Sequence, residues 1–295
     1  MIKELTVISG KGGTGKTTIT AAFASLAENA ILADCDVDAA DLHLILRPKI
    51  KKTTKFVGLQ LAVKDDSKCI NCGDCLDHCR FDAITADEKY NVIEERCEGC
   101  GVCVHVCPEG ALELKDRDSG RAYISDTRFG PMAHAALNIA EEASGKLVTV
   151  VRNYAKKLAR EHNRKLIIID GPPGIGCPVI AAISGVNMVL IVTEPTVSGI
   201  HDMERIIDVA KHFNIPAVVC INKYDINVEN SQKIEQYCQE NDVEVVAKLP
   251  YDNVTTKAMI EEKSVIEFSD GDFSNKMKEF WNNVYDQLQK ITRYD

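Results

Sequence analysis

The sequence predicts an α/β protein with a doubly wound, mostly parallel sheet and a smaller α+β domain inserted into it. First, short apolar segments rich in β-branched residues alternate with amphipathic segments of helical period, which is typical of parallel strands buried on both faces. Second, residues 68–114 break this alternation with a cysteine repeat. Because strands and helices resume after the repeat, we expect it to be an insertion within one α/β domain.

The apolar segments locate the individual elements. The expected strands are Leu5–Ser9, Ala30–Asp34, Leu166–Ile169, Met188–Val192, Ala217–Ile221 and Val243–Ala247. Helices are expected over residues 16–27, 200–212 and 232–240. A terminal helix carries an apolar stripe of Met277, Trp281, Val284 and Leu288. Because its polar face mixes acidic and basic residues, this helix is expected to pack on the sheet rather than on a membrane.

Composition excludes several classes of protein. Of the 295 residues, 45% are hydrophobic and 27% are charged, which is enough to form a sizeable core. Thirty-five basic and forty-four acidic residues give a net charge of −9, which argues against nucleic-acid binding. No apolar segment approaches the ~18–20 residues of a membrane span, and the N-terminus lacks the features of a signal peptide. We therefore expect a cytoplasmic protein.

The segment Gly10–Thr17 fits the phosphate-binding pattern G-x-x-x-x-G-K-[ST] between a strand and a helix. Its glycines let backbone N–H groups face phosphate oxygens, Lys16 reaches the β and γ oxygens, and the Thr17 hydroxyl can bind Mg²⁺. The expected phosphate-binding residues are Gly10, Lys11, Gly12, Gly13, Thr14, Gly15, Lys16, Thr17 and Thr18.

Lys11 adds a second lysine to this loop, and K-G-G-x-G-K-T-T resembles the deviant Walker A ATPases, which include MinD, ParA and the nitrogenase iron protein. The resemblance implies a P-loop ATPase that forms a nucleotide-dependent homodimer, in which Lys11 reaches the partner's phosphates. It implies that Asp34 holds a Mg²⁺-bound water and that Asp36 positions the attacking water. It also implies that Asp170 lies in the magnesium shell and that the Gly174 amide senses the γ-phosphate.

The base-binding residues are less defined by the sequence. Asn222–Asp225 reads N-K-x-D, the guanine-binding pattern of many GTPases. In the ATPases that the chain resembles, an asparagine at this position binds adenine, and the site continues into a loop that corresponds here to Pro250 and Asp252. The resemblance favours ATP, and GTP stays open.

Eight of the twelve cysteines form two C-x₂-C-x₂-C-x₃-C runs offset by 28 positions. This arrangement is that of bacterial ferredoxins, in which the fourth cysteine of each run binds the other [4Fe–4S] cluster. One cluster is therefore expected on Cys69, Cys72, Cys75 and Cys107, and the second on Cys97, Cys100, Cys103 and Cys79. Zinc is a weaker alternative, because Cys₄ zinc sites usually combine two separated cysteine pairs.

Together these motifs divide the chain into an ATPase domain of residues 1–58 and 116–295 and an inserted ferredoxin-like domain of residues 59–115. The basic run of residues 47–55 is expected to be an exposed linker between them. The whole chain resembles MinD/ParA-type ATPases that carry an inserted ferredoxin domain.

We hypothesise that MgATP binding and hydrolysis control electron transfer from two clusters to an acceptor protein. One alternative is an ATPase that assembles or carries an iron–sulfur or metal cofactor for a client protein. Another is a positioning ATPase that senses redox state. The identity of the partner and the role of Cys177 do not follow from the sequence.

Overall fold

The computed structural model describes residues 2–87, 89–138, 141 and 144–291. The chain forms two compact units. The first comprises Met1–Thr53, Ala122–Ala136 and Ser144–Asp295, and the second comprises Thr54–Arg121 and Leu137–Ala143. The chain passes from the first unit to the second before the cysteine repeat and returns after it. The first passage lies within strand β3 (Lys49–Lys64), and the return lies within strand β6 (Leu112–Thr127).

The basic run of residues 47–55, predicted to be a linker, therefore lies largely in strand β3, and that prediction was wrong. The run combines lysines with β-branched residues, as exposed strands often do. Lysine side chains on an exposed strand oppose its pairing with other chains and so its aggregation. Two of its lysines form ion pairs: Lys51 lies 3.0 Å from Asp126, and Lys55 lies 3.5 Å from Asp118.

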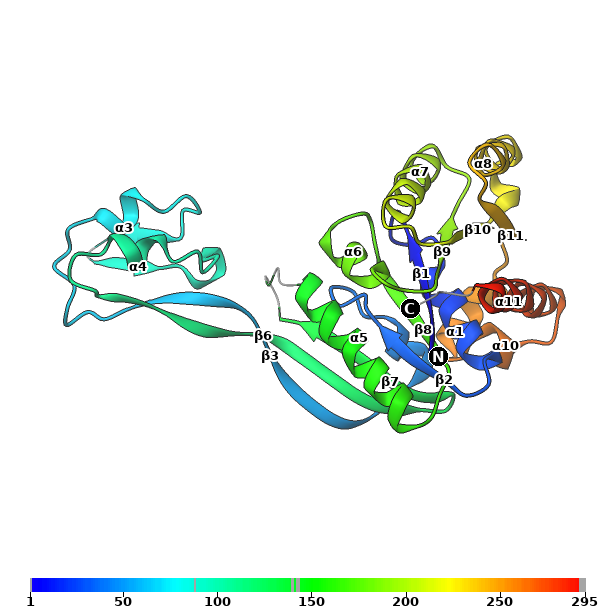
Figure 1. Ribbon diagram of the computed structural model, residues 1–295, viewed down its shortest axis with the longest axis horizontal. Helices are drawn as coiled ribbons and strands as arrows, with labels where there is room; N and C mark the ends of the chain where they lie inside the picture. The colour runs from blue at the N-terminus through cyan, green and yellow to red at the C-terminus, as the bar shows by residue number, and fades with distance from the viewer. Residues whose placement is uncertain (1, 88, 139–140, 142–143, 292–295) are drawn as a thin grey trace. The chain divides into compact units, whose positions relative to one another are not determined.

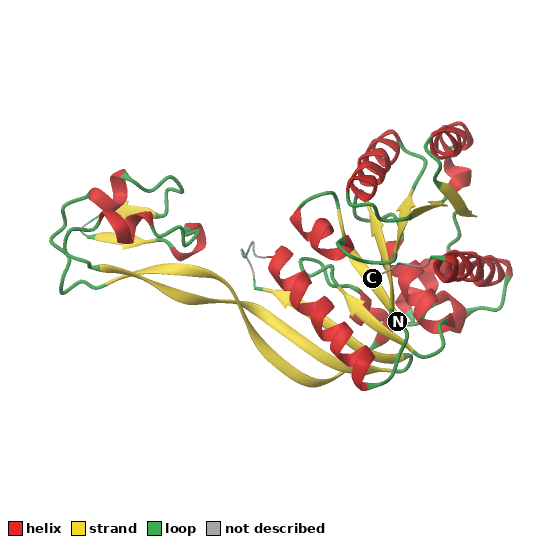
Figure 2. Cartoon of the chain, in the orientation of Figure 1, coloured by secondary structure: helices red, strands yellow, loops and turns green. Residues whose placement is uncertain are grey.

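A nine-stranded, mostly parallel sheet has the order β11-β10-β9-β1-β8-β2-β7-β6-β3 and alternates with helices along the chain (Figures 1 and 2). The other strands are β1 (Lys3–Ser9), β2 (Ala30–Asp34), β7 (Gly130–Leu137), β8 (Leu166–Pro173), β9 (Met188–Thr193), β10 (Ala217–Asn222) and β11 (Glu244–Leu249). Strand β1 pairs in parallel with β8 and β9, and β8 pairs in parallel with β2. The predicted α/β class and parallel sheet are confirmed.

Helices cover both faces of this sheet in the first unit. They are α1 (Lys16–Leu26), α2 (Leu42–Leu46), α5 (Ser144–Glu161), α6 (Cys177–Ile183), α7 (Val197–His212), α8 (Val228–Glu240), α9 (Val254–Ile260), α10 (Val265–Phe268) and α11 (Asp272–Lys290). Leu5 and Val7 of β1 belong to the core beneath α1 and α11. Thr6 points to the opposite face, where its hydroxyl donates a 3.2 Å hydrogen bond to the Ala182 carbonyl of α6.

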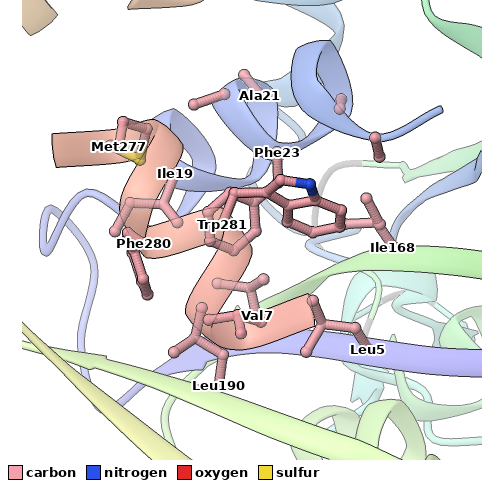
Figure 3. Packing of buried hydrophobic residues seen from close by; sticks show 14 of the residues in the cluster. Leu5, Val7, Ile19, Ala21, Phe23, Ile168, Leu190, Met277, Phe280 and Trp281 are labelled. Carbon is pink, nitrogen blue, oxygen red and sulfur yellow. The ribbon is translucent and has the colours of Figure 1, made fainter. Parts of the chain in front are cut away.

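The terminal helix α11 packs on the sheet, as predicted (Figure 3). The Phe23 ring of α1 lies 5.0 Å from Phe280 and 4.9 Å from Trp281 between ring centroids. Met277, Val284 and Leu288 of the predicted stripe are fully buried. Among the described residues, no helix has the length and apolar character to cross a bilayer.

Replacing Trp281 with alanine is expected to lower the free energy of unfolding by about 3–5 kcal/mol, because it removes a large buried side chain and leaves a cavity. Urea denaturation of both proteins measures this loss. The matched control is Phe213→Ala, which removes an aromatic ring that is 38% exposed. A loss for Trp281→Ala no larger than for the control would contradict the packing of α11 in the core.

The second unit has a short antiparallel pair, β4 (Ile84–Ala86) and β5 (Tyr90–Val92), and a 3-10 turn at Glu94–Arg96. Its two short helices are α3 (Asp74–Asp77) and α4 (Val102–Val106). Each begins after a glycine in left-handed conformation, Gly73 with φ 94° and Gly101 with φ 77°. These glycines are 28 positions apart, so the sequence repeat is also a repeat of backbone structure.

Candidate functional site

The loop between β1 and α1 depends on glycine at two positions. Gly13 has φ +80° and Gly15 has φ +92°, a region that other residues rarely adopt. A Cβ atom on Gly15 would lie 2.4 Å from Asn222 Nδ2, so the Asn222 side chain would have to move. The Asn222 amide instead donates a 2.7 Å hydrogen bond to the Thr14 carbonyl. The strand end of β10 thus supports the loop directly.

Lys16, at the start of α1, is the centre of a buried ion network. Only 6% of its surface is exposed. Its Nζ lies 3.1 Å from Asp36 Oδ2 and 3.1 Å from Asp170 Oδ1. The Thr17 hydroxyl donates a 2.8 Å hydrogen bond to Asp170 Oδ2. Four residues from three predicted segments therefore meet at the carboxyl ends of β2 and β8.

The carboxylates outnumber the single ammonium in this network. Burial lowers the pKa of Lys16, but the charges of Asp170, Asp36 and Asp34 outweigh it and raise that pKa above the usual value. Burial, followed by the charge of Asp170, raises the pKa of Asp34 well above its ordinary value. Burial also raises the pKa of Asp36, against the attraction of Lys16. Such excess negative charge suits a divalent cation.

Asp34 has an oxygen without a protein partner. Its Oδ1 accepts a 3.1 Å hydrogen bond from the Asp36 amide. Its buried Oδ2 has no hydrogen-bond partner within the described part of the chain. A buried acceptor of this kind normally binds water or an ion, so the atom fits the Mg²⁺-bound water predicted for Asp34.

Two cavities adjoin the loop and share some of its residues. A cavity of about 400 Å³ is lined by Gly12–Thr18, Asp36 and Pro173, among others. A cavity of about 190 Å³ is lined by Gly13, Gly15, Thr18, Asn222, Pro250, Tyr251 and Asp252, among others. We call the larger one the phosphate-like cavity and the smaller one the base-like cavity. Gly13, Gly15 and Thr18 line both, so the two cavities adjoin at the loop, as a site for one nucleotide requires.

Two predicted glycines do not line these cavities. Gly10 packs against α7, where a Cβ atom would lie 2.1 Å from Asp202 Cβ. The amide of Gly174 donates a 2.9 Å hydrogen bond to the Ser9 carbonyl. The proposed γ-phosphate sensor therefore has a partner within the chain in this state.

Comparison with known proteins identifies the family. The sequence model of the CobQ/CobB/MinD/ParA nucleotide-binding domain (CbiA) matches residues 5–265. The chain belongs to this family.

Its relatives include the uncharacterised protein MJ0578 of Methanocaldococcus jannaschii, which is 38% identical over 231 residues, or 77% of this chain and 80% of that protein. The septum site-determining protein MinD of Bacillus subtilis is 25% identical over 214 residues, or 70% of this chain and 59% of MinD. Among solved structures, MinD of Pyrococcus horikoshii complexed with Mg-ADP superimposes with a TM-score of 0.58 at 19% identity, over 100% of both chains. This last similarity supports the fold.

Lys11, the second lysine of this CobQ/CobB/MinD/ParA loop, contacts its own chain. Its Nζ lies 2.6 Å from Glu194 Oε1 and 3.1 Å from the Thr196 hydroxyl. Partial burial opposes ionisation of Glu194, but the hydrogen bond from Lys11 and the nearby Lys223 lower its pKa. No sequence motif pointed to Glu194. Its position directly after β9, at the edge where the other site residues lie, was the available signal.

Asp225, the last residue of the N-K-x-D segment, anchors a neighbouring loop. Its Oδ1 accepts a 2.7 Å hydrogen bond from the Tyr251 amide. Asp225 is not among the residues that line the base-like cavity, whereas Asn222 and Asp252 are. In this family member, Asp225 therefore holds the loop at Pro250–Asp252.

The cysteines of the second unit surround two further cavities. One is lined by Cys69, Cys72, Cys75 and Cys107. The other is lined by Cys79, Cys97, Cys100 and Cys103. Each set combines three cysteines of one run with the fourth of the other run. Over the described residues, no three His, Cys, Asp or Glu side chains converge closely enough to hold a single metal ion.

Proposed function

We propose that this chain is an ATP-binding and ATP-hydrolysing iron–sulfur protein that couples nucleotide-dependent switching or dimerisation to electron transfer from two [4Fe–4S] clusters. The observation that carries the proposal is the grouping of eight cysteines around two cavities, four to each. A [4Fe–4S] cluster takes four cysteine thiolates, and runs with this spacing exchange their fourth ligand. The acceptor would be a redox protein.

The surroundings of the cysteines fit such a cluster better than a zinc ion. Each thiolate of a cubane binds a different iron atom, so the four sulfurs stand further apart than around one ion, which agrees with the absence of a single-ion grouping over the described residues. The Ala111 amide donates a 3.3 Å hydrogen bond to Cys107 Sγ, the kind of contact that tunes a cluster. Bound clusters would supply one-electron transfer.

The nucleotide site supports the ATPase half of the proposal. Lys16 would bind the phosphates, and Thr17, Asp34 and Asp170 would hold magnesium directly or through water. The partnerless Asp34 oxygen and the excess of carboxylates fit this cation. Asp36, 8% exposed and facing the phosphate-like cavity, would position the attacking water.

Dimerisation would require Lys11 to exchange partners. In the single chain its ammonium is held by Glu194 and the Thr196 hydroxyl. Since 32% of the Lys11 side chain is exposed, it can turn outward toward a second copy when nucleotide is bound. The single-chain contact is therefore compatible with the predicted homodimer.

The nucleotide site is expected to bind ATP more tightly than GTP. The variant Asp225→Asn tests whether Asp225 takes part in recognising the base. The asparagine Oδ1 can still accept from the Tyr251 amide, so ATP affinity is expected to stay within about twofold. Asp225→Ala removes that anchor and is expected to weaken ATP about tenfold, in line with about 1.4 kcal/mol for one hydrogen bond. Competition of ATP and GTP against a fluorescent ATP analogue measures both. A change in base preference on Asp225→Asn would identify it as a guanine contact.

The coupling itself is tested by anaerobic EPR of the reduced protein with and without MgATP, together with hydrolysis assays of the oxidised and reduced protein. Spectra that change with nucleotide, and hydrolysis that changes with reduction, are the expected results. Unchanged spectra and hydrolysis that ignores redox state would argue against coupling.

A cofactor carrier is the second candidate function. It is favoured by Cys177, an exposed cysteine at the start of α6, three residues beyond Gly174. Transfer of a cluster to an acceptor protein that lacks one, blocked by Cys177→Ser, would support the carrier. Clusters retained through many rounds of hydrolysis would support electron transfer.

A further inference from the structure

The two cysteine cavities are related by the 28-residue repeat, and this relation allows their walls to be compared position by position. Lys64 and Tyr90 line the cavity of Cys69, Cys72, Cys75 and Cys107, which we call the first centre. Ala62 and Val92 line the cavity of Cys79, Cys97, Cys100 and Cys103, the second centre. Val92 is 28 positions from Lys64, and Tyr90 is 28 positions from Ala62. Equivalent wall positions are thus polar at one centre and aliphatic at the other.

Lys64 places a buried positive charge beside the first centre. Only 9% of its side chain is exposed, and its ammonium lies 2.8 Å from Asp66 Oδ1. Apart from this ion pair, the buried Nζ has no hydrogen-bond partner over the described residues. Asp66 is 58% exposed, so water screens its charge more than that of Lys64.

Other charged wall residues do not offset this difference. Glu109 lines the first centre and Glu98 lines the second, so each has one carboxylate. Over the described residues, Lys64 is the only lysine or arginine that lines either cavity.

Beside the second centre, the Arg117 guanidinium donates a 3.4 Å hydrogen bond to the Cys97 carbonyl, but it is paired at 2.5 Å with the buried carboxylate of Glu141. Within the described part of the chain, Lys64 is paired only with the exposed Asp66, so the first centre has the more positive surroundings.

We propose that the positive charge of Lys64 raises the reduction potential of the cluster at the first centre. That cluster then has the higher potential of the two and is the first to accept an electron. The inference rests on the proposed function, since it requires clusters at both centres. One electron from a one-electron donor adds one negative charge to the first centre, and the step moves no proton. No bond forms or breaks. The adjacent ammonium stabilises the added charge, whereas Val92 offers no such stabilisation at the second centre.

The test is a redox titration of the intact protein, followed by EPR with dithionite as the reductant. Two midpoints are expected. Lys64→Met is expected to shift the reduction equilibrium at the higher midpoint potential at least tenfold toward the oxidised form, which is equivalent to 59 mV for one electron. The lower midpoint potential is expected to stay unchanged. Lys64→Arg keeps the charge and is expected to restore most of the shift. Asp66→Asn, at an exposed position, is expected to move the same midpoint in the opposite direction.

Lys68→Met is the matched control, because it removes an equal charge from an exposed lysine next to Cys69 that lines neither cavity. An unmoved higher midpoint, a shift of the lower midpoint, or an equal shift in Lys68→Met would each overturn the inference. If Lys64→Met fails to fold, Lys64→Gln, which keeps a polar side chain without the charge, replaces it with the same expected shift. Iron and sulfide content of the unaltered protein is measured first, so a lack of clusters counts against the proposed function rather than against Lys64.

Discussion

Lys16→Ala is expected to reduce ATP hydrolysis at least about 1,000-fold, a loss of transition-state stabilisation of about 4 kcal/mol. The ammonium that would contact the phosphates is also the one that holds Asp36 and Asp170 together, each at 3.1 Å. Its removal therefore affects both the nucleotide and the arrangement of the two carboxylates. Phosphate release measured at saturating MgATP checks the expected loss.

The same substitution is expected to destabilise the nucleotide-free protein by about 3–5 kcal/mol at pH 8, because it leaves buried carboxylates unpaired. The pKa values of Asp34 and Asp36 are already raised, and loss of the nearby positive charge raises them further. Carboxyl groups with raised folded-state pKa values stabilise the fold below their unfolded pKa and lose that contribution as pH rises through the folded value. Urea denaturation should therefore show a smaller destabilisation at pH 5 than at pH 8.

Two further variants separate catalysis from folding. Lys157→Ala removes an exposed lysine of α5 and is expected to leave hydrolysis and stability unchanged. Asp36→Asn keeps Lys16 paired with Asp170 and is expected to bind ATP while losing hydrolysis. Hydrolysis at the original rate in folded Lys16→Ala would refute the site assignment.

Double cysteine substitutions are expected to distinguish the two centres. The outcome depends on which cysteines line the same cavity and not on which belong to the same sequence run. Cys72 and Cys107 line the same cavity, so replacing both with alanine is expected to remove one [4Fe–4S] signal and lower the iron content from about eight to about four per chain. Cys72 and Cys79 belong to one run but line different cavities, so replacing both is expected to remove both signals.

EPR of the reduced proteins and chemical iron and sulfide analysis distinguish these outcomes. Cys177→Ala is the control, since this cysteine lies outside both cavities and is exposed in the first unit. If the Cys72/Cys79 pair lost one signal and the Cys72/Cys107 pair lost two, each centre would instead be formed within one run. Unchanged iron in both pairs would contradict iron–sulfur binding at these cysteines.

Local sequence predicted the nucleotide loop and the strands β1, β2, β8, β9, β10 and β11, but it missed β7, which also pairs in parallel with β2. Strand β2 has the predicted bounds, Ala30–Asp34, because an apolar run between polar neighbours marks a buried strand. Strand β8 extends past the predicted Ile169 to Pro173, since its last residues pair with β1 although they are not apolar. The basic run was mistaken for a linker because an exposed strand lacks the apolar signal on which such predictions depend.

The sequence by itself predicted the nucleotide loop and the two cysteine sets, because both follow from spacing along the chain, and the family resemblance pointed to the carboxylates at the strand ends. Only the tertiary structure decided what those groups contact. The ion pair of Lys11 with Glu194 and the anchoring of Tyr251 by Asp225 join residues far apart in the chain. The repeat makes Lys64 and Val92 equivalent, but only the tertiary structure shows that each lines a cysteine cavity, because burial is set by the surrounding elements.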